Sequence, residues 1–422
     1  MPEWYQDAAW RILRSTRGRD LRARYNVSAL FRDPEPRESY VLLANHAHRR
    51  DPWVIGSLLT RTIRYMANLE GTNPAKAVFA DLVGAYGKRK GAPDYAALKR
   101  TLDLGRAGET LGIFPEGDRS WDGRPASPRP GLGKLLRVLG LPVLLARQEG
   151  SYLTGPRWAE RERRGRWTVE FRVLSRERVL EEDPPVLESE IRSILAEDDL
   201  REPALRPVRF ECPEPAAGIG RLLWLCPSCG GEDVLGGAGD RITCRACGAA
   251  WTVDGNQRLA GGPAGTDYSD LRDWTDFQRA RLAERIRSAE PVGGSPGLGA
   301  PEPGAPAPDP RAVGAALPGS EGRKAVVSSG DVELRKRTGR GTGTFGRGRL
   351  ELFRDALVFR PAGGGNPAAF DPLRVRYFVD NFNNYCEYSY GSGRYRLLFR
   401  GGNAFKWIEA LETLRGGGGE ST

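Results

Sequence analysis

The chain has 422 residues, a formal net charge of +10 and a hydrophobic fraction of 39%. Its 54 glycines and 31 prolines are too many for one compact core, so we expect several domains and at least one loose segment. We expect neither a membrane-spanning helix nor a signal peptide, because no apolar run reaches about 18 residues and no charged start precedes an apolar core. The basic charge fits nucleic acid, an anionic membrane surface or acidic substrates as partners.

The first segment, residues 3–25, has the apolar spacing of a helix and carries many arginines. Trp4 and Trp10 are of the residue type that is enriched at membrane interfaces. The pattern therefore predicts an interfacial helix that associates peripherally with an anionic membrane. Since no signal peptide is expected, we expect the protein to stay in the cytoplasm or on the cytoplasmic face of the membrane. The alternative is a surface helix that packs on the domain that follows.

Strand and helix patterns alternate between residues 39 and 200. Strands are expected at 40–44, 110–114, 141–146 and 167–173, and helices at 53–59, 95–107 and 186–196. Asp51 and Pro52 have the pattern of a helix N-cap followed by proline in the first turn. The alternation predicts an α/β domain over residues 1–208 with a largely parallel central sheet.

The remaining chain changes character along its length. Residues 209–262 are turn-rich and contain cysteines, residues 263–290 contain a helical segment, and residues 291–322 form a flexible Pro/Gly/Ala-rich linker. Residues 323–416 have short strand patterns, hairpin turns and a closing helix. They predict a small, mainly β barrel with a C-terminal helix.

In the α/β domain, the loop after the strand expected at 40–44 contains residues suited to catalysis. It reads Asn45-His46-Ala47-His48-Arg49-Arg50-Asp51. The carboxyl ends of strands are where ligands usually bind in α/β domains. The carboxylate of Asp51 can accept a bond from one imidazole nitrogen of His46 and leave the other nitrogen as a base. Asp51 can also be a simple helix cap, so this loop alone does not define a site.

A second loop, Phe114-Pro115-Glu116-Gly117-Asp118-Arg119-Ser120, follows another buried strand. Gly117 permits a tight turn, and Arg119 offers a guanidinium fork that suits a phosphate. Glu116 can orient a hydroxyl or the arginine. Taken alone, the loop is as well explained by an ordinary polar connection.

Together the two loops resemble the signature blocks of the glycerol-3-phosphate and lysophosphatidate acyltransferase family. The first loop matches the family's block N-H-x-x-x-x-D, and the second matches F-P-E-G-T-R-S everywhere except at Asp118. A Gly-rich basic stretch that ends at Arg89 corresponds to the block between them, and residues 141–143 correspond to a hydrophobic block with proline. The resemblance covers roughly residues 25–200.

The resemblance implies transfer of an acyl group from acyl-CoA or acyl carrier protein to the free hydroxyl of lysophosphatidate. His46 would be the general base and Asp51 its partner. The residues expected to bind substrate are Asn45, Arg89, Phe114, Pro115, Glu116, Gly117 and Arg119. No cysteine occurs in residues 1–211, so a cysteine acyl-enzyme is excluded in this domain.

Two departures from the family pattern leave the acceptor open. Asp118 puts a negative charge near the expected phosphate, unless it points away or Arg119 neutralises it. His48 is a competing candidate for the base, although the block spacing favours His46. The same chemistry on glycerol 3-phosphate or another lysolipid is an alternative. A non-catalytic scaffold that binds lipid or nucleic acid is an alternative of another class.

Four of the six cysteines form two C-x-x-C pairs, each followed by glycine: Cys226 with Cys229, and Cys244 with Cys247. This pattern resembles a zinc ribbon, in which four thiolates hold a structural Zn²⁺ and leave no open position for catalysis. A redox role is the lesser interpretation, and Cys212 is expected to be an unpaired thiol, as is Cys386. The mixed local charge does not favour nucleic acid as a partner.

Residues 323–415 resemble pleckstrin-homology or GRAM-like domains in strand pattern rather than in motif. Their basic side chains either bind an anionic lipid headgroup or form an ordinary solvated face. These side chains are Arg335, Lys336, Arg337, Arg340, Arg347 and Arg349. The linker before them is expected to let this domain move relative to the α/β domain.

Overall fold

A computed structural model describes residues 4–69, 74–88, 94–291, 310, 323–338, 341–381, 385–400 and 402–416. The chain forms two compact units, and each is described by itself. Unit 1 consists of Met1–Pro215 and Asp254–Arg258, and unit 2 consists of Ala216–Val253 and Leu259–Thr422. The predicted linker, residues 291–322, lies almost entirely outside the described residues.

Unit 1 is built on a mixed seven-stranded sheet with the strand order β1-β7-β6-β2-β5-β3-β4. Neighbouring strands are parallel except for β6 and β7, which pair antiparallel. The strands are β1 (Val27–Phe31), β2 (Val41–Ala44), β3 (Ile63–Asn68), β4 (Tyr86–Lys88), β5 (Thr110–Ile113), β6 (Val143–Glu149) and β7 (Trp167–Leu174). The α/β domain expected from the sequence is present, and one antiparallel pairing makes its sheet mixed.

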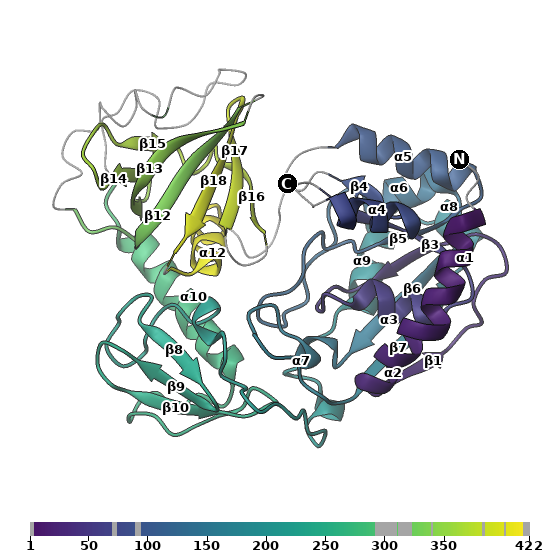
Figure 1. Ribbon diagram of the computed structural model, residues 1–422, viewed down its shortest axis with the longest axis horizontal. Helices are drawn as coiled ribbons and strands as arrows, with labels where there is room; N and C mark the ends of the chain where they lie inside the picture. The colour runs from purple at the N-terminus through teal and green to yellow at the C-terminus, as the bar shows by residue number, and fades with distance from the viewer. Residues whose placement is uncertain are drawn as a thin grey trace. The chain divides into compact units, whose positions relative to one another are not determined.

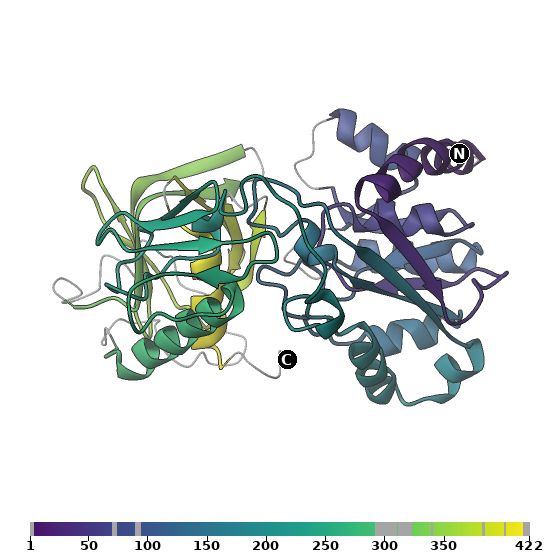
Figure 2. The same cartoon turned by 90° about the horizontal axis from the view of Figure 1, so that it is seen from below.

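Helices lie on both faces of this sheet (Figures 1 and 2). In β2, Leu42 and Ala44 pack into one hydrophobic core, whereas Val41 and Leu43 pack into a second one. All four β2 residues are buried, which is why this strand has a continuous apolar sequence. The helices are α1 (Trp4–Leu13), α2 (Arg19–Arg24), α3 (Asp51–Leu58), α4 (Pro74–Leu82), α5 (Tyr95–Arg106), α6 (Leu132–Leu139), α7 (Ser151–Thr154), α8 (Arg176–Glu181) and α9 (Pro184–Leu195).

The predicted N-terminal helix is divided into α1 and α2 by a π-helical turn at Arg14–Gly18. Trp10 is buried, and its indole N–H donates to the carbonyl of Val83 over 2.8 Å. Trp4, by contrast, is 69% exposed. The segment therefore packs on its own domain through Trp10 and keeps Trp4 at the surface. Among the described helices, none is both long and apolar enough to cross a lipid bilayer.

In unit 2 the cysteine pairs belong to a four-stranded antiparallel sheet with the order β11-β10-β9-β8. Its strands are β8 (Leu235–Ala238), β9 (Arg241–Cys244), β10 (Ala250–Val253) and β11 (Leu259–Ala260). Helix α10 (Leu271–Ser288) follows, and it begins where the Asp270 side chain accepts bonds from the amides of Arg272 and Asp273.

The C-terminal part of unit 2 is a seven-stranded antiparallel sheet that packs against helix α12 (Ala404–Leu414) (Figure 1). The strands are β12 (Val327–Thr338), β13 (Gly341–Leu352), β14 (Leu357–Pro361), β15 (Ala368–Phe370), β16 (Arg376–Asn381), β17 (Tyr385–Tyr390) and β18 (Gly393–Phe399). Among the described residues β15 and β16 form its two edges and do not pair with each other. The expected barrel is therefore an open half-barrel.

The parts of unit 2 share one hydrophobic core. Trp224, which precedes the first cysteine pair, lies in the same cluster as Leu282 of α10 and Trp407 of α12. The indole N–H of Trp224 also donates to Glu409 of α12 over 3.1 Å, and Arg279 of α10 contacts the same carboxylate at 2.7 Å. The separate stretches expected from the sequence thus pack against one another as one unit.

A buried lysine connects α12 to the cysteine-bearing region. The side chain of Lys406 is fully buried, and its Nζ contacts Glu232 at 3.3 Å and also Asp233. The same Nζ donates to the carbonyl of Ser328 over 2.6 Å. A buried ammonium group requires such partners, because an unpaired charge is strongly unfavourable away from water.

The basic side chains expected to meet an anionic headgroup are mostly paired with acids within the half-barrel. The pairs Arg335–Glu333, Arg347–Asp331 and Arg349–Glu351 have N–O distances of 2.7, 2.9 and 3.1 Å. Arg340 lies outside the described residues. The acids offset part of the positive charge on which the headgroup prediction rested.

Candidate active site

The loop between β2 and α3 is organised around the carboxylate of Asp51. This side chain is fully buried, and its Oδ2 lies 2.7 Å from Nδ1 of His46. The same oxygen accepts the backbone N–H groups of Ala47 and His48, at 2.9 and 3.0 Å. Asp51 is the first residue of α3, and Arg50 occupies the N-cap position, so the expected N-cap role of Asp51 is wrong. The carboxylate holds the preceding loop instead.

His46 is oriented so that one ring nitrogen remains for chemistry. Because a carboxylate accepts at Nδ1, the neutral imidazole carries its hydrogen on Nδ1 and its lone pair on Nε2. The ring stacks on Phe114 with a centroid distance of 4.1 Å and is 20% exposed. The structure thus brings His46 and Asp51 together with Phe114, which follows His46 by 68 residues in the chain.

His48 has a different environment although it lies two residues away. It is fully buried, and burial lowers its pKa to about 4, against the opposing effect of Asp51. Its Nδ1 accepts the backbone N–H of Arg50 over 3.1 Å, and its ring lies 5.1 Å from that of Trp167. A neutral imidazole enclosed by aromatic rings is a packing group, which agrees with the choice of His46 as the base.

The second loop supports the backbone of His46 from the neighbouring strand β5. Glu116 accepts the backbone N–H of His46 over 3.0 Å, and the amide of Ser120 donates to the carbonyl of His46 over 3.0 Å. Burial raises the pKa of Glu116 to about 8, although the bond from His46 opposes this shift. Glu116 therefore contacts the backbone of the loop that carries His46, a role that its motif position does not reveal.

Asp118, the residue that departs from the family pattern, is neutralised by a cation that the sequence did not indicate. Its carboxylate lies 2.8 Å from Nη1 of Arg157, whose side chain is only 2% exposed. Asp118 also accepts the backbone N–H of Arg119 over 2.8 Å. The negative charge is thus matched locally by Arg157, which lies 38 residues downstream of Arg119.

Gly117 requires its residue type. It has φ = +78°, in the left-handed region, and an added Cβ would come within 3.0 Å of Nε of Arg129. Arg129 is exposed, and its positive charge lowers the pKa of Lys88 in β4, where burial is the larger cause. Arg129 therefore lies beside the second loop, and its charge is near enough to Lys88 to affect the pKa of that lysine. Arg89, the cation expected there, lies outside the described residues.

Asn45 uses its side chain to join two strand ends. Its side chain exchanges two hydrogen bonds with the backbone of Gln148, at 2.7 and 3.0 Å. Gln148 returns a third bond from its own side chain to the carbonyl of Asn45, at 2.6 Å. These bonds join the ends of β2 and β6, so Asn45 fixes the strand end from which His46 projects.

A small, partly open hollow lies beside His46. Its lining residues are Asn45, His46, Ala47, Glu116, Ser120, Gly123, Arg124, Pro125, Gln148, Ser151, Tyr152, Glu197 and Asp199. Burial raises the pKa of Glu197 to about 8, with Asp199 as the next cause, and burial raises that of Asp199 to about 7. Asp199 accepts the backbone N–H groups of Gly150 and Leu153 over 2.7 and 3.1 Å, and Glu197 pairs with Arg147, so both acids also support the backbone beside the hollow. Sequence reasoning missed this pair, because an acidic run after a helix resembles a solvated loop.

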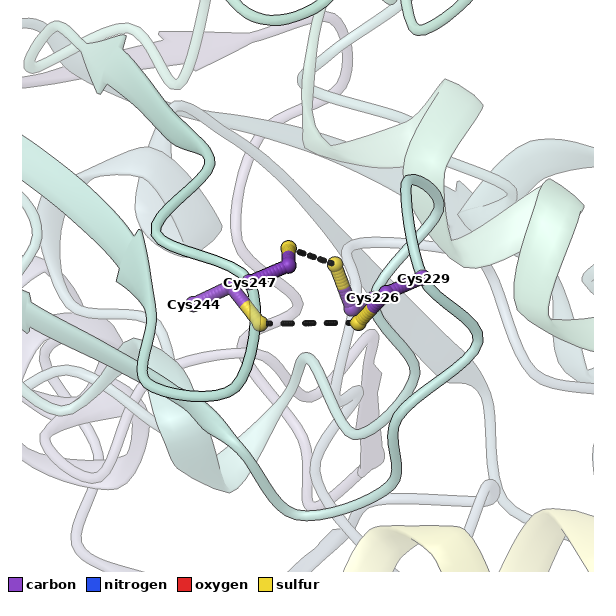
Figure 3. A group of neighbouring side chains, drawn as sticks. All are labelled: Cys226, Cys229, Cys244 and Cys247. Atoms are coloured by element: carbon purple, nitrogen blue, oxygen red, sulfur yellow. Dashed lines mark hydrogen bonds between the residues drawn. The ribbon is translucent and has the colours of Figure 1, made fainter.

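The four cysteines of unit 2 converge, as Figure 3 shows. Their sulfurs lie within 4.8 Å of one another, with Cys226–Cys247 and Cys229–Cys244 distances of 3.9 and 3.8 Å. Four thiolates at Zn–S bonds of about 2.3 Å have sulfurs about 3.8 Å apart in a tetrahedron. None of the six cysteines, all of which lie in the described residues, forms a disulfide, and Cys212 and Cys386 lie outside this cluster. The donor set therefore fits a closed tetrahedral metal site.

Comparison with known proteins bears on unit 1. Residues 24–144 match the family model described as Acyltransferase, a stretch that contains both loops. The chain is thus an acyltransferase enzyme. Comparison with curated proteins gives no match. Among solved structures, it is similar to the 1-acyl-sn-glycerophosphate (LPA) acyltransferase PlsC of Thermotoga maritima, at 16% identity and a TM-score of 0.38, over 44% of this chain and 76% of that one.

Proposed function

We propose that unit 1 transfers a fatty acyl group from acyl-CoA or acyl carrier protein to the free hydroxyl of lysophosphatidate or a closely related lysolipid. The observation that carries the proposal is the 2.7 Å contact between His46 Nδ1 and the buried carboxylate of Asp51. It lies at the carboxyl end of β2, inside the region that matches the acyltransferase family.

In the proposed reaction His46 acts as a general base. Its Nε2 takes the proton of the acceptor hydroxyl while the oxygen attacks the thioester carbonyl carbon. The carbon–sulfur bond then breaks, and the thiolate leaves with the proton that Nε2 returns to it. Asp51 accepts a hydrogen bond from the Nδ1–H group throughout, and its negative charge stabilises the imidazolium that forms transiently.

The acceptor phosphate is proposed to lie beside Gly117, where cations converge. The pKa of Lys88 is lowered mainly by burial. Repulsion by the positive charge of Arg129 lowers it further. A bound phosphate would relieve this repulsion and accept hydrogen bonds from Arg129 and Arg119. Because Arg157 already matches Asp118, the departure from the family motif does not oppose a phosphate.

Unit 2 is proposed to have a structural role. Cys226, Cys229, Cys244 and Cys247 would hold one Zn²⁺ that crosslinks two short loops, and four thiolate ligands leave no place for substrate. The exposed Trp4 and the basic surface are proposed to bring the enzyme to an anionic membrane that contains its acceptor.

A transfer assay with paired variants tests the proposed reaction. The chain is given labelled acyl-CoA or acyl carrier protein with a panel of lysolipids and glycerol 3-phosphate. We expect transfer to a phosphate-bearing acceptor, and a loss of about a hundredfold or more in kcat for His46→Ala, the scale of a general base. Equal activity of wild type and His46→Ala would refute His46 as the base. Absence of transfer to every acceptor would favour a non-catalytic lipid-binding protein.

A further inference from the structure

Five residues between two strands of the cysteine-bearing sheet pack within the acyltransferase unit. Asp254–Arg258 connect β10 to β11 and belong to unit 1, whereas the strands themselves belong to unit 2. The segment is a tight turn, in which the amide of Gln257 donates to the carbonyl of Asp254 over 3.0 Å. Gln257 has φ = +64°, a conformation that a residue with a side chain rarely adopts without support from its surroundings.

The neighbours of Gln257 attach this turn to unit 1. The side chain of Asn256 accepts the backbone N–H of Phe210 over 3.0 Å and donates to the carbonyl of Val208 over 2.6 Å. Gly255 leaves no room for a side chain, because an added Cβ would lie 1.6 Å from the carbonyl oxygen of Phe210. Both contacts place the turn against residues 208–210.

Gln257 itself is fully buried and reaches a tyrosine of the candidate site. Its Oε1 lies 3.3 Å from the hydroxyl of Tyr152, which lines the hollow beside His46. The same hydroxyl is 3.2 Å from the carbonyl of Trp121 and accepts the indole N–H of Trp158 over 3.2 Å. Buried polar side chains nearly always have a hydrogen-bond partner, and for Gln257 this partner is the hydroxyl of Tyr152.

A short path leads from this hydroxyl to the catalytic loop. Trp121 follows Ser120 directly, and the amide of Ser120 donates to the carbonyl of His46 over 3.0 Å. The ring of Tyr152 also lies against Gly123, where an added Cβ would come within 2.7 Å. Tyr152 therefore contacts the segment 121–123 both through its hydroxyl and through its ring.

We propose that Gln257 is a positioning residue for acyl transfer. Through the hydroxyl of Tyr152 it holds the segment 120–123, and this segment in turn holds the backbone of His46. A hydroxyl carries one hydrogen, so the Tyr152 oxygen can donate to Trp121 and also bond to residue 257 only if the side-chain amide of Gln257 turns its Nε2, which is buried without a partner, toward the hydroxyl in place of Oε1. The inference rests on the proposed function, since the positioned group is the proposed base.

The kinetic test compares full-length variants. Gln257→Leu and Tyr152→Phe should each lower kcat about fivefold to tenfold and change the KM for the acyl donor less than about twofold, because a misplaced base affects the reaction and not donor binding. The double variant should be no slower than the slower single variant. Gln257→Glu keeps a side chain of the same size that can donate to the hydroxyl as the neutral acid, and it should retain more of kcat than Gln257→Leu. Thr252→Ala, an exposed change on the same hairpin, should leave kcat unchanged.

A measurement that does not depend on activity accompanies the kinetics. Hydrogen exchange of the amides in residues 116–124 should be about tenfold faster in Gln257→Leu than in wild type or Thr252→Ala, as expected when a local anchor is lost. Unchanged exchange, or losses of kcat that multiply in the double variant, would overturn the inference. If the wild type transfers no acyl group, the proposed function fails, and the exchange result alone then decides the role of Gln257.

Discussion

The buried charges around Lys406 in unit 2 and the buried acids beside His46 in unit 1 have different surroundings. In unit 2 the buried Lys406 is matched by Glu232 and Asp233, and the charges join parts of the chain that are far apart in sequence. In unit 1 burial raises the pKa of Glu116 to about 8 and that of Asp199 to about 7, and both acids line the hollow beside His46. Matched charges are typical of structural junctions, and acids with shifted pKa values are typical of functional sites.

Removal of the proposed metal should have the largest effect, and it should be confined to unit 2. We expect about one Zn²⁺ per chain by elemental analysis, and loss of the folded cysteine region in Cys247→Ser or after chelation, because metal binding supplies about 10–16 kcal/mol to comparable sites. Near-ultraviolet circular dichroism before and after chelation measures this change. Cys386→Ser, outside the cluster, is the control for the metal content. A metal-free protein with the wild-type spectrum would contradict the prediction.

Loss of the buried lysine should be the next largest effect. Lys406→Met leaves two acids without their cation and should lower the free energy of unfolding of unit 2 by about 3 kcal/mol. Urea unfolding followed by tryptophan fluorescence measures it, with the exposed Lys324→Met as control. The additional change Asp233→Asn should restore part of the loss. An unfolding curve identical to that of the control would show that the contact is not stabilising.

Removal of a proposed phosphate contact should have a moderate effect that is confined to unit 1. Arg129→Gln should raise the KM for the acceptor about tenfold and leave the KM for the acyl donor unchanged, because one charge-assisted bond contributes about 1.5 kcal/mol. Lys134→Gln, an exposed change in α6, is the matched control. If the KM for the donor rises instead, the cations beside Gly117 serve the donor.

The pH dependence of stability should show the smallest effect. The folded chain keeps a proton on Glu116 up to about pH 8, whereas the unfolded chain releases it near the ordinary value of 4.5. The folded form thus binds more protons between these values, and this contribution to stability decreases as the pH rises. Glu116→Gln keeps the acceptor for the His46 amide, and its Tm should fall about 3 °C less than that of wild type between pH 5 and 8.

Calorimetry at the two pH values measures this difference. The exposed Glu181→Gln should behave like wild type, because its surroundings hardly change on unfolding. A Glu116→Gln variant whose Tm falls as steeply as that of wild type would mean that Glu116 is ionised in the folded chain.

The sequence was sufficient where spacing alone determines contact. The residues His46 and Asp51 are five apart on one loop, and the two C-x-x-C pairs bring their own turns, so local geometry predicted both groupings. Contacts that depend on the paths of distant strands were not predictable. The pairing of Asp118 with Arg157 and the placement of Gln257 beside Tyr152 arise only when separate segments are packed together.

The same limit applies to the fold. A buried strand such as β2 is evident from its continuous apolar run. Several such runs alternate with helical patterns, and this alternation predicted the α/β domain. The half-barrel was expected to be closed, because alternating strands reveal their faces and not whether the first and last strands meet. The shared core of unit 2 was also hidden, since Trp224 and Trp407 are separated by most of the unit.

The chain contains only two histidines, and one of them, His48, is fully buried. An imidazole-directed acylating reagent such as diethyl pyrocarbonate should therefore modify the folded protein at a single histidine, His46. The number of labelled histidines per chain then counts functional molecules in a preparation. A bound acceptor that covers His46 would slow the labelling, so the labelling rate would measure how much of the protein has bound acceptor.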